Sequence, residues 1–343
     1  MAHRRLVVWI HSPRYPTWSI PADTLRRLRD IAGPGWEVEL IEFEATASGD
    51  GVSAVPEEVL AAVEDAEIYF GFGIPDAVVL RGDELRWVHS AAAGVRTSLE
   101  GPLGEADILF TNSAGIHGPP VAETVLGYLL HFARGLDLAV RSQARGEWQK
   151  APFDAADAPV REVAGSTVGV VGLGGIGREV AWRAKALGAT VVGLRRRPEP
   201  VAGVELLTGE DALGELLERS HFVVLTVPET ASTRGLIGER ELRRMGLDTV
   251  LVNVSRGALV DEEALASALR DGHIRGAALD VFSSEPLPSG HPLWTTPATL
   301  ITPHTSAYTH DFWRREAALL MDNLERYRAG SPLRNVVDRE AGY

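Results

Sequence analysis

A glycine pattern in the middle of the chain constrains the fold more than any other feature. The run Gly172-Leu173-Gly174-Gly175-Ile176-Gly177 follows an apolar segment at 168–171 and precedes a helix-like segment at 178–187. In such a strand, turn and helix, the first glycine permits the tight turn, the second lets backbone approach a pyrophosphate, and the third lets helix pack on strand. The helix N-terminus then faces the phosphates of a dinucleotide. The predicted cofactor contacts in this turn are Gly172, Gly174, Gly175, Ile176 and Gly177.

Three arginines stand where such a unit distinguishes its two cofactors. A second strand is expected at 190–194, and Arg195 follows it, close to the spacing of roughly 20 residues at which an acidic residue reads the ribose of NAD. A carboxylate there repels a 2′-phosphate, whereas guanidinium groups pair with that phosphate bidentately. Arg195, Arg196 and Arg197 therefore favour NADP(H) as the cofactor. The alternative is that they are a solvated charge run and that NAD(H) binds.

The composition indicates a globular protein of two domains. A chain of 343 residues exceeds the usual size of one core. The net charge of −13 argues against nucleic acid as a partner, because phosphate backbones need a basic surface. Since the chain has no cysteine, disulfides and thiol catalysis are excluded, and we expect no metal site. An anionic substrate must be met by a local positive group.

No segment of the sequence predicts a membrane span. The apolar run at 6–10 is too short for a secretory signal and predicts a first strand. The longest apolar stretch, 121–140, contains Glu123, Arg134 and Asp137, which argue against a span. We expect a cytoplasmic protein with no membrane partner.

Strand-like and helix-like runs alternate along the chain, which is typical of parallel βαβ units. We expect a long connecting helix at 121–136, an extended arm at 139–159, and a last helix at 312–329 that folds back onto the first domain. The predicted fold class is α/β, with two Rossmann-like domains built on doubly wound parallel sheets. The expected strands are at 6–10, 37–43, 68–72, 85–89, 108–110, 168–171, 190–194, 222–227, 250–254, 277–282 and 300–302, and early helices are expected at 22–30 and 56–66.

Two polar residues follow predicted strands, at the sheet edge where doubly wound folds bind ligands. Arg256 comes after the strand at 250–254 and could form a fork onto a carboxylate or a polarised carbonyl; the alternative is a pair with Glu262. His304 comes after the strand at 300–302, and a carboxylate beside its imidazole would favour the proton-donating form.

Glu285 is the candidate carboxylate for His304. A competing histidine, His291, is closer to Glu285 in sequence but stands in a loop. A third element is the segment at 88–95, where a strand runs into small residues. Ala93 and Gly94 there can offer bare backbone N–H groups to an anion. A hydride carrier, a proton donor and an anion clamp are what a carbonyl reduction needs.

Together these motifs resemble the D-isomer-specific 2-hydroxyacid dehydrogenase family, and in particular its glyoxylate/hydroxypyruvate reductase branch. The resemblance rests on the segments at 172–177, 252–257 and 278–288 and on Thr302-Pro303-His304, and it extends over essentially the whole chain. It implies a discontinuous, flavodoxin-like substrate domain formed by 1–116 and 309–343. A dinucleotide-binding Rossmann domain at 117–308 would be inserted between the two segments.

The resemblance also implies roles for individual residues. Arg256, Glu285 and His304 would be catalytic: His304 protonates the reduced carbonyl of a small 2-oxo acid, Glu285 holds the imidazole, and Arg256 binds the substrate with the N–H groups of Ala93 and Gly94. Asp280 would contact the nicotinamide carboxamide. Further cofactor contacts are expected from Val227, Pro228, Thr233, Val254 and Ser255.

Some features leave the substrate and the assembly open. The resemblance implies a homodimer, with the arm at 145–153 and Trp148 reaching a partner. Arg96 and the long loop at 11–19 depart from the family pattern and could alter the substrate site. The alternatives to a glyoxylate or hydroxypyruvate reductase are a dehydrogenase for bulkier 2-oxo acids and a non-catalytic, corepressor-like NAD(H) sensor.

Overall fold

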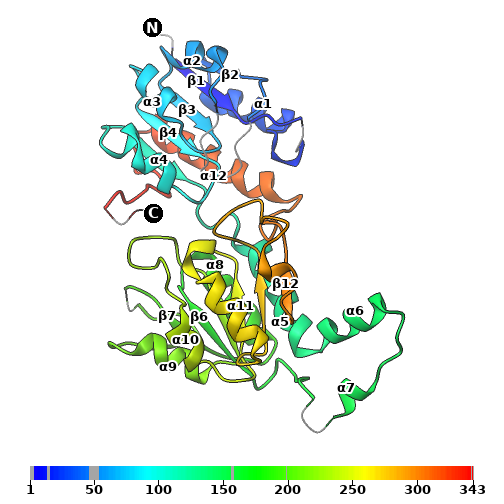
Figure 1. Cartoon of the computed structure of the whole chain (residues 1–343). Coiled ribbons are helices and arrows are strands. Elements are labelled where there is room, and N and C mark those ends of the chain that lie inside the picture. The colour runs from blue at the N-terminus through cyan, green and yellow to red at the C-terminus, as the bar shows by residue number, and fades with distance from the viewer. Residues whose placement is uncertain are drawn as a thin grey trace. The chain divides into compact units, whose positions relative to one another are not determined.

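The computed structural model describes residues 4–13, 16–45, 54–155, 158–197, 199–340 and 342. The chain forms two compact units (Figure 1). Unit 1 combines Met1–His117 with Thr309–Tyr343, and unit 2 is Gly118–Tyr308. Unit 1 is therefore made from both ends of the chain.

Unit 1 contains a five-stranded sheet in the order β2-β1-β3-β4-β5, and every neighbouring pair is parallel. This order is that of flavodoxin-like folds, in which the strand order reverses between the first and third strands. The flavodoxin-like sheet expected from the sequence is confirmed. Its strands are β1 (Arg4–Trp9), β2 (Trp36–Leu40), β3 (Ile68–Gly71), β4 (Trp87–Ser90) and β5 (Leu109–Asn112).

Helices cover both faces of this sheet because successive side chains of a buried strand point to opposite faces. Leu6 and Val8 of β1 join the core beneath α1 (Ala22–Ala32) and α12 (Phe312–Arg328), whereas Val7 and Trp9 join the core beneath α2 (Glu57–Val63) and α3 (Asp76–Arg81). The helical elements of unit 1 are η1 (Pro16–Trp18), α1 (Ala22–Ala32), α2 (Glu57–Val63), α3 (Asp76–Arg81), α4 (Arg96–Glu100), η2 (Pro102–Gly104) and α12 (Phe312–Arg328).

Unit 2 contains a seven-stranded parallel sheet in the order β12-β11-β10-β9-β6-β7-β8. The strand order reverses between β6 and β9, which is the switch point at which Rossmann folds bind dinucleotides. Both Rossmann-like sheets predicted from the sequence are thus present. The strands are β6 (Thr167–Val171), β7 (Thr190–Leu194), β8 (Glu205–Leu206), β9 (Phe222–Leu225), β10 (Val250–Asn253), β11 (Gly276–Leu279) and β12 (Thr299–Ile301).

The second sheet is also covered on both faces. Residues of α5 (Gly118–Ala133) and α8 (Gly175–Ala186) belong to one buried cluster. Residues of α9 (Ala212–Arg219), α10 (Glu239–Arg244) and α11 (Glu262–Arg270) belong to the other. The helical elements of unit 2 are α5 (Gly118–Ala133), α6 (Leu136–Ala144), α7 (Ala151–Asp154), α8 (Gly175–Ala186), α9 (Ala212–Arg219), α10 (Glu239–Arg244), η3 (Gly257–Leu259), α11 (Glu262–Arg270) and η4 (Pro292–Trp294).

The structure corrects the prediction of one long helix followed by an extended arm. The helix ends at Ala133 because Gly135, with a φ of 64°, turns the chain before α6 begins. The arm is partly helical, containing α6 and α7, which extend away from the rest of unit 2 (Figure 1). An ion pair of 2.8 Å between Asp137 and Arg275 fixes α6 to the sheet. Trp148, between the two arm helices, is 93% exposed.

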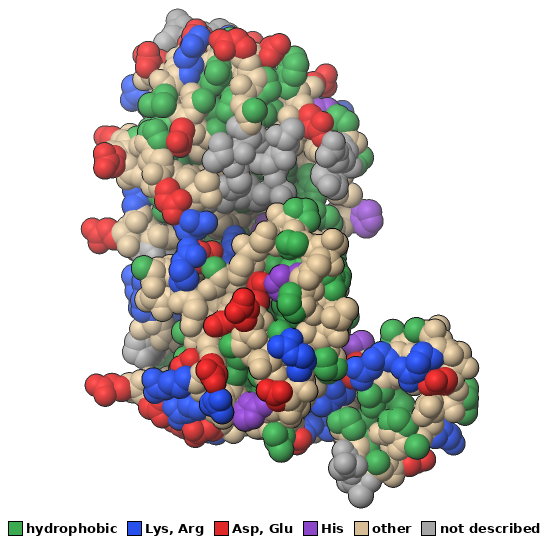
Figure 2. Space-filling model, viewed as in Figure 1, with side chains coloured by type: hydrophobic (Ala, Val, Ile, Leu, Met, Phe, Trp, Pro, Cys, Tyr) green, Lys and Arg blue, Asp and Glu red, His purple; other side chains and the backbone are tan. Residues whose placement is uncertain are grey.

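The surface carries charges of both signs. In Figure 2, Lys, Arg, Asp and Glu side chains are interspersed over the visible face of both units. Among the described residues, no helix has the length and apolar character needed to cross a membrane.

Candidate active site

The glycine turn after β6 is shaped as a dinucleotide cradle. Gly172 has a φ of 101°, and a Cβ there would lie 2.6 Å from Val227 Cγ1. A Cβ on Gly177 would lie 1.9 Å from the carbonyl oxygen of Gly172, so α8 packs directly on the turn. A Cβ on Gly174 would meet no atom within 4 Å, which leaves open space at the N-terminus of α8. The turn is therefore closely packed at Gly172 and Gly177 and open at Gly174, which is the arrangement that a bound diphosphate requires.

Backbone N–H groups at the start of α8 are available to an anion. Within the described chain, the amides of Gly174, Gly175, Ile176 and Gly177 donate no hydrogen bond, and the first helical bond runs from Arg178 N to Gly174 O. The first N–H groups of a helix lack intrahelical partners and carry partial positive charge. These residues fit a nicotinamide dinucleotide.

Hydrogen bonds connect the loops that follow β6, β9 and β10 beside this turn. Thr226 donates its hydroxyl to Gly172 O, and Ser255 donates its hydroxyl to Val227 O. Thr233 donates its hydroxyl to Pro228 O at 2.7 Å and so closes the loop after β9. The structure thus brings the predicted cofactor residues of β6, β9 and β10 to one sheet edge; Val254, next to Ser255, is buried there. Direct cofactor contacts of these residues stay predictions.

The three arginines after β7 differ in their surroundings. Arg195 forms an ion pair of 3.0 Å with Glu199, donates to its carbonyl oxygen at 3.1 Å, and is only 15% exposed in its side chain. Arg196 and Arg197 are exposed. Arg195 is therefore held at the end of the strand, whereas the other two are at the surface, and together they place positive charge where the sequence predicts the 2′-phosphate.

His304 and Glu285 form a hydrogen-bonded couple at the end of the sheet. His304 Nδ1 lies 2.7 Å from Glu285 Oε2, and Glu285 Oε1 accepts from Phe282 N at 2.9 Å. Because a carboxylate only accepts, the proton in this bond belongs to Nδ1. Nε2 has no hydrogen-bond partner among the described residues and is left for a ligand. The couple predicted from the sequence has the geometry of a positioned proton donor.

The pKa of Glu285 is lowered from its ordinary value. Burial by itself would raise this pKa, but the hydrogen bonds from His304 and Phe282 N, and the positive charges of His304 and Arg256, outweigh burial and lower it. The carboxylate therefore stays ionised beside the imidazole.

Arg256 lies near this couple, and its guanidinium pairs with no carboxylate of the described residues. It donates to Ser255 O at 2.7 Å, and within the described chain it forms no ion pair. Glu262, the alternative partner considered from the sequence, instead pairs with His291 at 3.2 Å and accepts from Ser283 N at 2.7 Å. Arg256 is exposed, so it can bind an anionic ligand.

Gly257 fixes the distance between the arginine turn and the glutamate loop. A Cβ on Gly257 would lie 1.9 Å from the carbonyl carbon of Phe282 and 2.2 Å from Ser283 N. Only glycine allows this approach of the backbones, which brings Arg256 near the loop that carries Glu285.

Asn253 is a positioning residue that the sequence analysis did not single out. Its side chain is 1% exposed, donates to Arg256 O at 2.8 Å and accepts from Ser255 N at 3.1 Å. The amide side chain thus shapes the turn from both sides. A buried polar residue at the end of the apolar strand Val250–Asn253 was the signal that could have identified it.

Asp280 shapes the loop that carries His304. Its carboxylate accepts from the hydroxyl of Thr302 at 2.5 Å, from Thr305 N at 2.9 Å and from Ser306 N at 3.0 Å. Its carbonyl oxygen accepts from His304 N at 2.9 Å. The predicted contact of Asp280 with a nicotinamide carboxamide stays a prediction.

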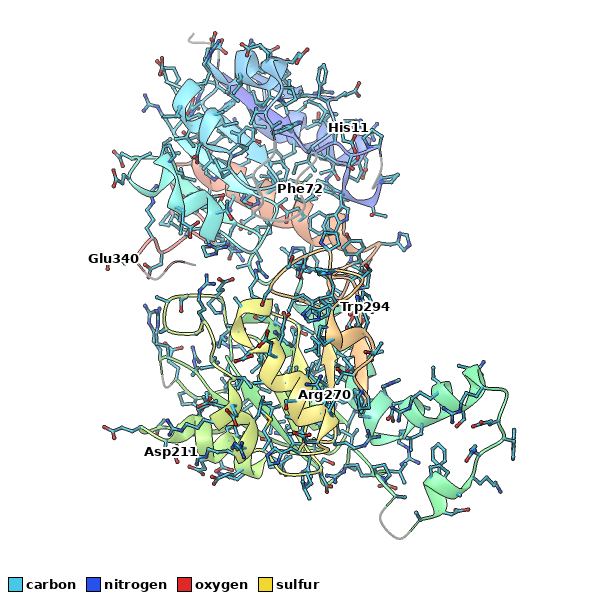
Figure 3. All side chains as sticks on the ribbon, in the orientation of Figure 1. His11, Phe72, Asp211, Arg270, Trp294 and Glu340 are labelled. Atoms are coloured by element: carbon cyan, nitrogen blue, oxygen red, sulfur yellow. The ribbon has the colours of Figure 1, made fainter. Side chains whose placement is uncertain are left out.

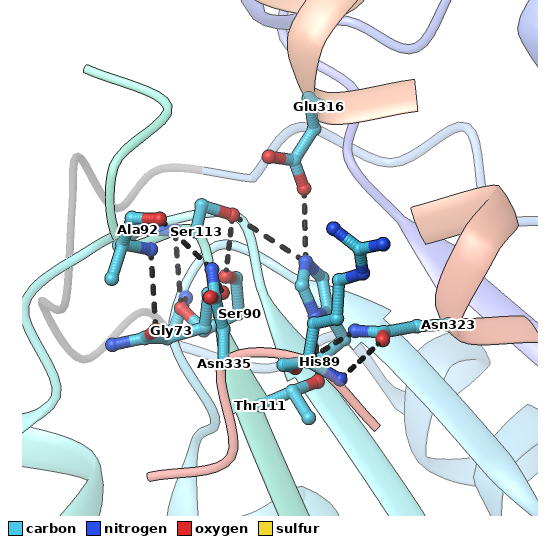
Figure 4. A network of polar contacts seen from close by, with 12 residues as sticks. Gly73, His89, Ser90, Ala92, Thr111, Ser113, Glu316, Asn323 and Asn335 are labelled. Atoms are coloured by element: carbon cyan, nitrogen blue, oxygen red, sulfur yellow. Dashed lines mark hydrogen bonds and ion pairs between the residues drawn. The ribbon is translucent and has the colours of Figure 1, made fainter. Parts of the chain in front are cut away.

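In unit 1, the turn after β4 exposes two amides. Within the described part of the chain, the N–H groups of Ala93 and Gly94 donate no hydrogen bond. Asn112 donates to Ala93 O at 2.9 Å. Ser90 Oγ accepts from Gly73 N and Ala92 N at 3.1 and 3.2 Å (Figure 4). These bonds hold the turn from neighbouring strands, so its free N–H groups have a fixed direction, as an anion-binding turn requires.

A buried polar network supports this turn. His89 Nε2 lies 3.0 Å from Glu316 Oε1 of α12, and His89 Nδ1 lies 2.7 Å from Thr111 Oγ1 (Figure 4). The indole of Trp87 donates to the same Thr111 oxygen at 2.8 Å.

Arg96, just after the turn, forms a surface ion pair of 2.8 Å with Glu100. The described residues contain no cluster that could hold a metal ion.

Comparison with known proteins identifies the family. Residues 126–306, more than half of the chain, match the model of the D-isomer specific 2-hydroxyacid dehydrogenase, NAD binding domain. The chain is 33% identical to glyoxylate/hydroxypyruvate reductase B of Yersinia enterocolitica over 93% of this chain and 95% of that protein. It is 35% identical to D-3-phosphoglycerate dehydrogenase of Methanocaldococcus jannaschii over 82% of this chain, a match that spans 53% of that protein's length.

A solved structure extends the similarity to the whole chain. The crystal structure of D-isomer specific 2-hydroxyacid dehydrogenase from Xanthobacter autotrophicus Py2, in complex with NADPH and MES, matches 100% of both chains with a TM-score of 0.80 and 31% identity. The resemblance inferred from the motifs is confirmed. This chain is an oxidoreductase that belongs to the D-isomer specific 2-hydroxyacid dehydrogenase family.

Proposed function

We propose that the protein reduces a small 2-oxo acid of the glyoxylate or hydroxypyruvate type to the D-2-hydroxy acid, with NADPH as the preferred reductant. The observation that carries this proposal is the His304–Glu285 couple at 2.7 Å with Arg256 beside it. At one sheet edge lie a proton donor and a guanidinium that forms no ion pair with any described residue, and these match the two ends of a 2-oxo acid. The named reductase from Yersinia enterocolitica supports the substrate class.

The residues divide the chemistry between them. A bound nicotinamide supplies the hydride that reduces C2 of the substrate. Arg256 binds the substrate carboxylate and polarises the carbonyl oxygen, because its planar fork fits two oxygens at once. His304 donates the Nε2 proton to the developing alkoxide, and Glu285 holds the ring and stabilises its positive charge before that transfer. The N–H groups of Ala93 and Gly94 are proposed as a second contact for the substrate carboxylate.

The preference for NADPH rests on Arg195 and its two neighbours. Arg195 is held by Glu199 but keeps its Nε free of any described partner, and the flanking arginines add positive charge. The related dehydrogenase from Xanthobacter autotrophicus Py2 was crystallised with NADPH. NADH remains the alternative reductant.

Replacing Arg195 with aspartate is expected to weaken NADPH binding by about ten- to a hundredfold, since a charge-assisted hydrogen bond contributes about 1.5–3 kcal/mol. NADH binding should change far less, because NADH lacks the 2′-phosphate. The measurement is the Kd of each nucleotide by fluorescence titration. Glu199→Gln is the matched control: it breaks the ion pair with Arg195 but keeps the guanidinium. Equal losses for both nucleotides in Arg195→Asp would show that the arginines are surface charge.

The direct test of the proposed function is an initial-rate panel with NADPH and NADH. The substrates are glyoxylate, hydroxypyruvate, pyruvate, phenylpyruvate and branched 2-oxo acids. We expect the highest kcat/KM with NADPH and with glyoxylate or hydroxypyruvate. Tight NADPH binding without turnover of any substrate would contradict the proposal and favour the non-catalytic sensor.

An aromatic pair in unit 1 favours a second candidate, a reductase for bulkier 2-oxo acids. Trp18 lies edge-on against Phe72, with ring centroids 5.5 Å apart. Phe72 follows β3 (Figure 3). Both side chains are half-buried, and the neighbouring Gly73 donates to Ser90 Oγ, in the turn that carries Ala93. Rings of this kind pack well on apolar groups. A higher kcat/KM for phenylpyruvate than for glyoxylate would favour this candidate.

Other expectations stay predictions. In the loop at 11–19, Tyr15 lies outside the described residues, so its effect on the substrate site is not part of the proposal. A homodimer formed through the arm, with Trp148 at the contact, is proposed on the resemblance and on the exposure of that indole. A cytoplasmic location also stays a prediction.

A further inference from the structure

A tyrosine on α5 is connected to the His304 loop through a threonine. Tyr128 is 4% exposed, and its hydroxyl lies 2.5 Å from Thr302 Oγ1. Thr302 donates its hydroxyl to Asp280 Oδ1 at 2.5 Å. Because the threonine proton is used in the bond to the carboxylate, Thr302 accepts from Tyr128. The direction of the chain is thus fixed: Tyr128 donates to Thr302, and Thr302 donates to Asp280.

The carboxylate at the end of this chain controls the loop that presents the proton donor. Asp280 is 0% exposed and accepts from Thr302, Thr305 N and Ser306 N, while its carbonyl oxygen accepts from His304 N. Every one of these donors belongs to residues 302–306. His304 itself has a φ of 54°, a left-handed conformation that non-glycine residues rarely adopt unless their surroundings impose it.

The buried charge of Asp280 depends on these hydrogen bonds. Among the described residues no lysine or arginine forms an ion pair with it, and an ionised carboxylate out of water is costly unless donors compensate. A hydroxyl that itself accepts a hydrogen bond donates more strongly, since chains of hydrogen bonds polarise one another. Tyr128 therefore supports Asp280 through Thr302, without touching it.

Tyr128 is suited to a permanent donor role. Burial, together with the negative charge of Asp280, raises the pKa of its phenol to about 12, although the bond to Thr302 opposes this rise. Its hydroxyl therefore stays protonated across the neutral range. A second side chain on the same helix face, Thr124, donates to Ser306 O at 3.3 Å, as expected for residues four apart on a helix. α5 thus contacts the His304 loop at two points.

We propose that Tyr128 and Thr302 are positioning residues for His304, holding its loop in the conformation that proton donation needs. This inference rests on the proposed function, in which His304 is the proton donor. Neither residue contacts the reacting atoms in this scheme. Their effect passes through the orientation of the Thr302 hydroxyl and the three hydrogen bonds that the Asp280 carboxylate accepts.

The test compares four variants with the wild-type enzyme. Tyr128→Phe removes only the donor, Thr302→Val removes the relay while keeping its shape, and Thr302→Ser keeps the hydroxyl. Tyr69→Phe is the matched control, because the Tyr69 hydroxyl is buried in unit 1 without a hydrogen-bond partner among the described residues. We expect kcat to fall about three- to tenfold in Tyr128→Phe and at least tenfold in Thr302→Val. The KM for NADPH, and the kcat of Thr302→Ser and Tyr69→Phe, should stay near wild type.

A double variant tests whether the tyrosine acts through the threonine. If it does, Tyr128→Phe combined with Thr302→Val should lose no more kcat than Thr302→Val alone. If instead the fold losses of kcat in the two single variants multiply in the double variant, the two residues act through independent packing effects, which would overturn the proposal. So would a loss in Thr302→Ser equal to that in Thr302→Val.

Hydrogen exchange provides a readout that does not depend on turnover. In Tyr128→Phe, amide protection should fall in peptides that cover 302–308, because the bonds of Thr305 N and Ser306 N to Asp280 weaken, and should be unchanged in the peptides of β6 and β10. Unchanged protection at 302–308 would overturn the positioning role even in an enzyme with no known substrate. Faster exchange there, in an enzyme that turns over no 2-oxo acid, would support the positioning role and refute only the proposed function.

Discussion

Replacing His304 with alanine should lower kcat for 2-oxo acid reduction by about 10²- to 10⁴-fold, the usual contribution of a positioned general acid. The alkoxide formed at C2 would lose its proton donor, whereas the glycine turn and the N-terminus of α8 would be unaltered. The Kd for NADPH should therefore stay within about threefold of the wild-type value. Steady-state kinetics and a nucleotide titration, carried out on the same preparation, measure both quantities.

His291→Ala is the matched control for this variant. His291 is also paired with a glutamate, at 3.2 Å from Glu262, but it lies next to η4 and its Nδ1 accepts from Leu293 N. Its replacement should leave kcat nearly unchanged. If His291→Ala lost as much activity as His304→Ala, the assignment of the proton donor would be wrong.

The lowered pKa of Glu285 adds a pH dependence to the same couple. Because the pKa is lower in the folded protein than in the unfolded chain, the carboxylate contributes stability above the unfolded value and loses it as pH falls through the folded value. The difference in Tm between wild type and Glu285→Gln should therefore shrink as pH falls through the acid range in which the Glu285 carboxylate is protonated. A difference that still grew in that acid range would contradict the ionised carboxylate.

Replacing Arg256 with glutamine should reduce kcat/KM for the 2-oxo acid by about ten- to a hundredfold, because a hydrogen bond between charged groups contributes about 1.5–3 kcal/mol. The loss should be in both KM and kcat, since the guanidinium binds the carboxylate and stabilises the negative charge that develops on the carbonyl oxygen. The KM for NADPH should change little. Initial rates over a range of both substrates separate these terms.

Arg256→Lys is the informative companion to this variant. It keeps the positive charge but removes the planar fork, so it should recover only part of the lost activity. Full recovery would show that charge alone is required at this position. A Kd for NADPH that rose in parallel with the loss of kcat/KM would move Arg256 from the substrate site to the cofactor site.

The parallel sheets were predictable because their signal is repeated along the chain. Apolar runs such as Val168–Val171 alternate with helical segments, and the structure places them in two doubly wound sheets. The arm was not predictable at this level: α7 is a short helix between prolines and charges, and Gly135 separates α5 from α6. The strand Glu205–Leu206 is too short to produce a periodic signal.

Those site residues were predictable whose side-chain type by itself indicates a chemical role. His304 and Glu285 could be paired in advance because imidazole and carboxylate have complementary charge. The contact of Asp280 with Thr302 depends instead on strand register: Leu279 pairs with Ile301, the last residues of β11 and β12, so the residues that follow the two strands lie side by side. Tyr128 reaches this pair from a helix far away in sequence, and a tyrosine in an apolar helix resembles any core aromatic.

The discontinuity of unit 1 has a consequence for how the protein is made. The core beneath β1 includes Phe312, Leu320 and Leu324 of α12, which pack with Leu28 of α1. During synthesis, the ribosome completes all of unit 2 before it produces α12. The apolar face that β1 and α1 share with α12 is therefore uncovered while the dinucleotide-binding sheet assembles, and a nascent chain stalled before residue 312 exposes that face to aggregation or to a chaperone.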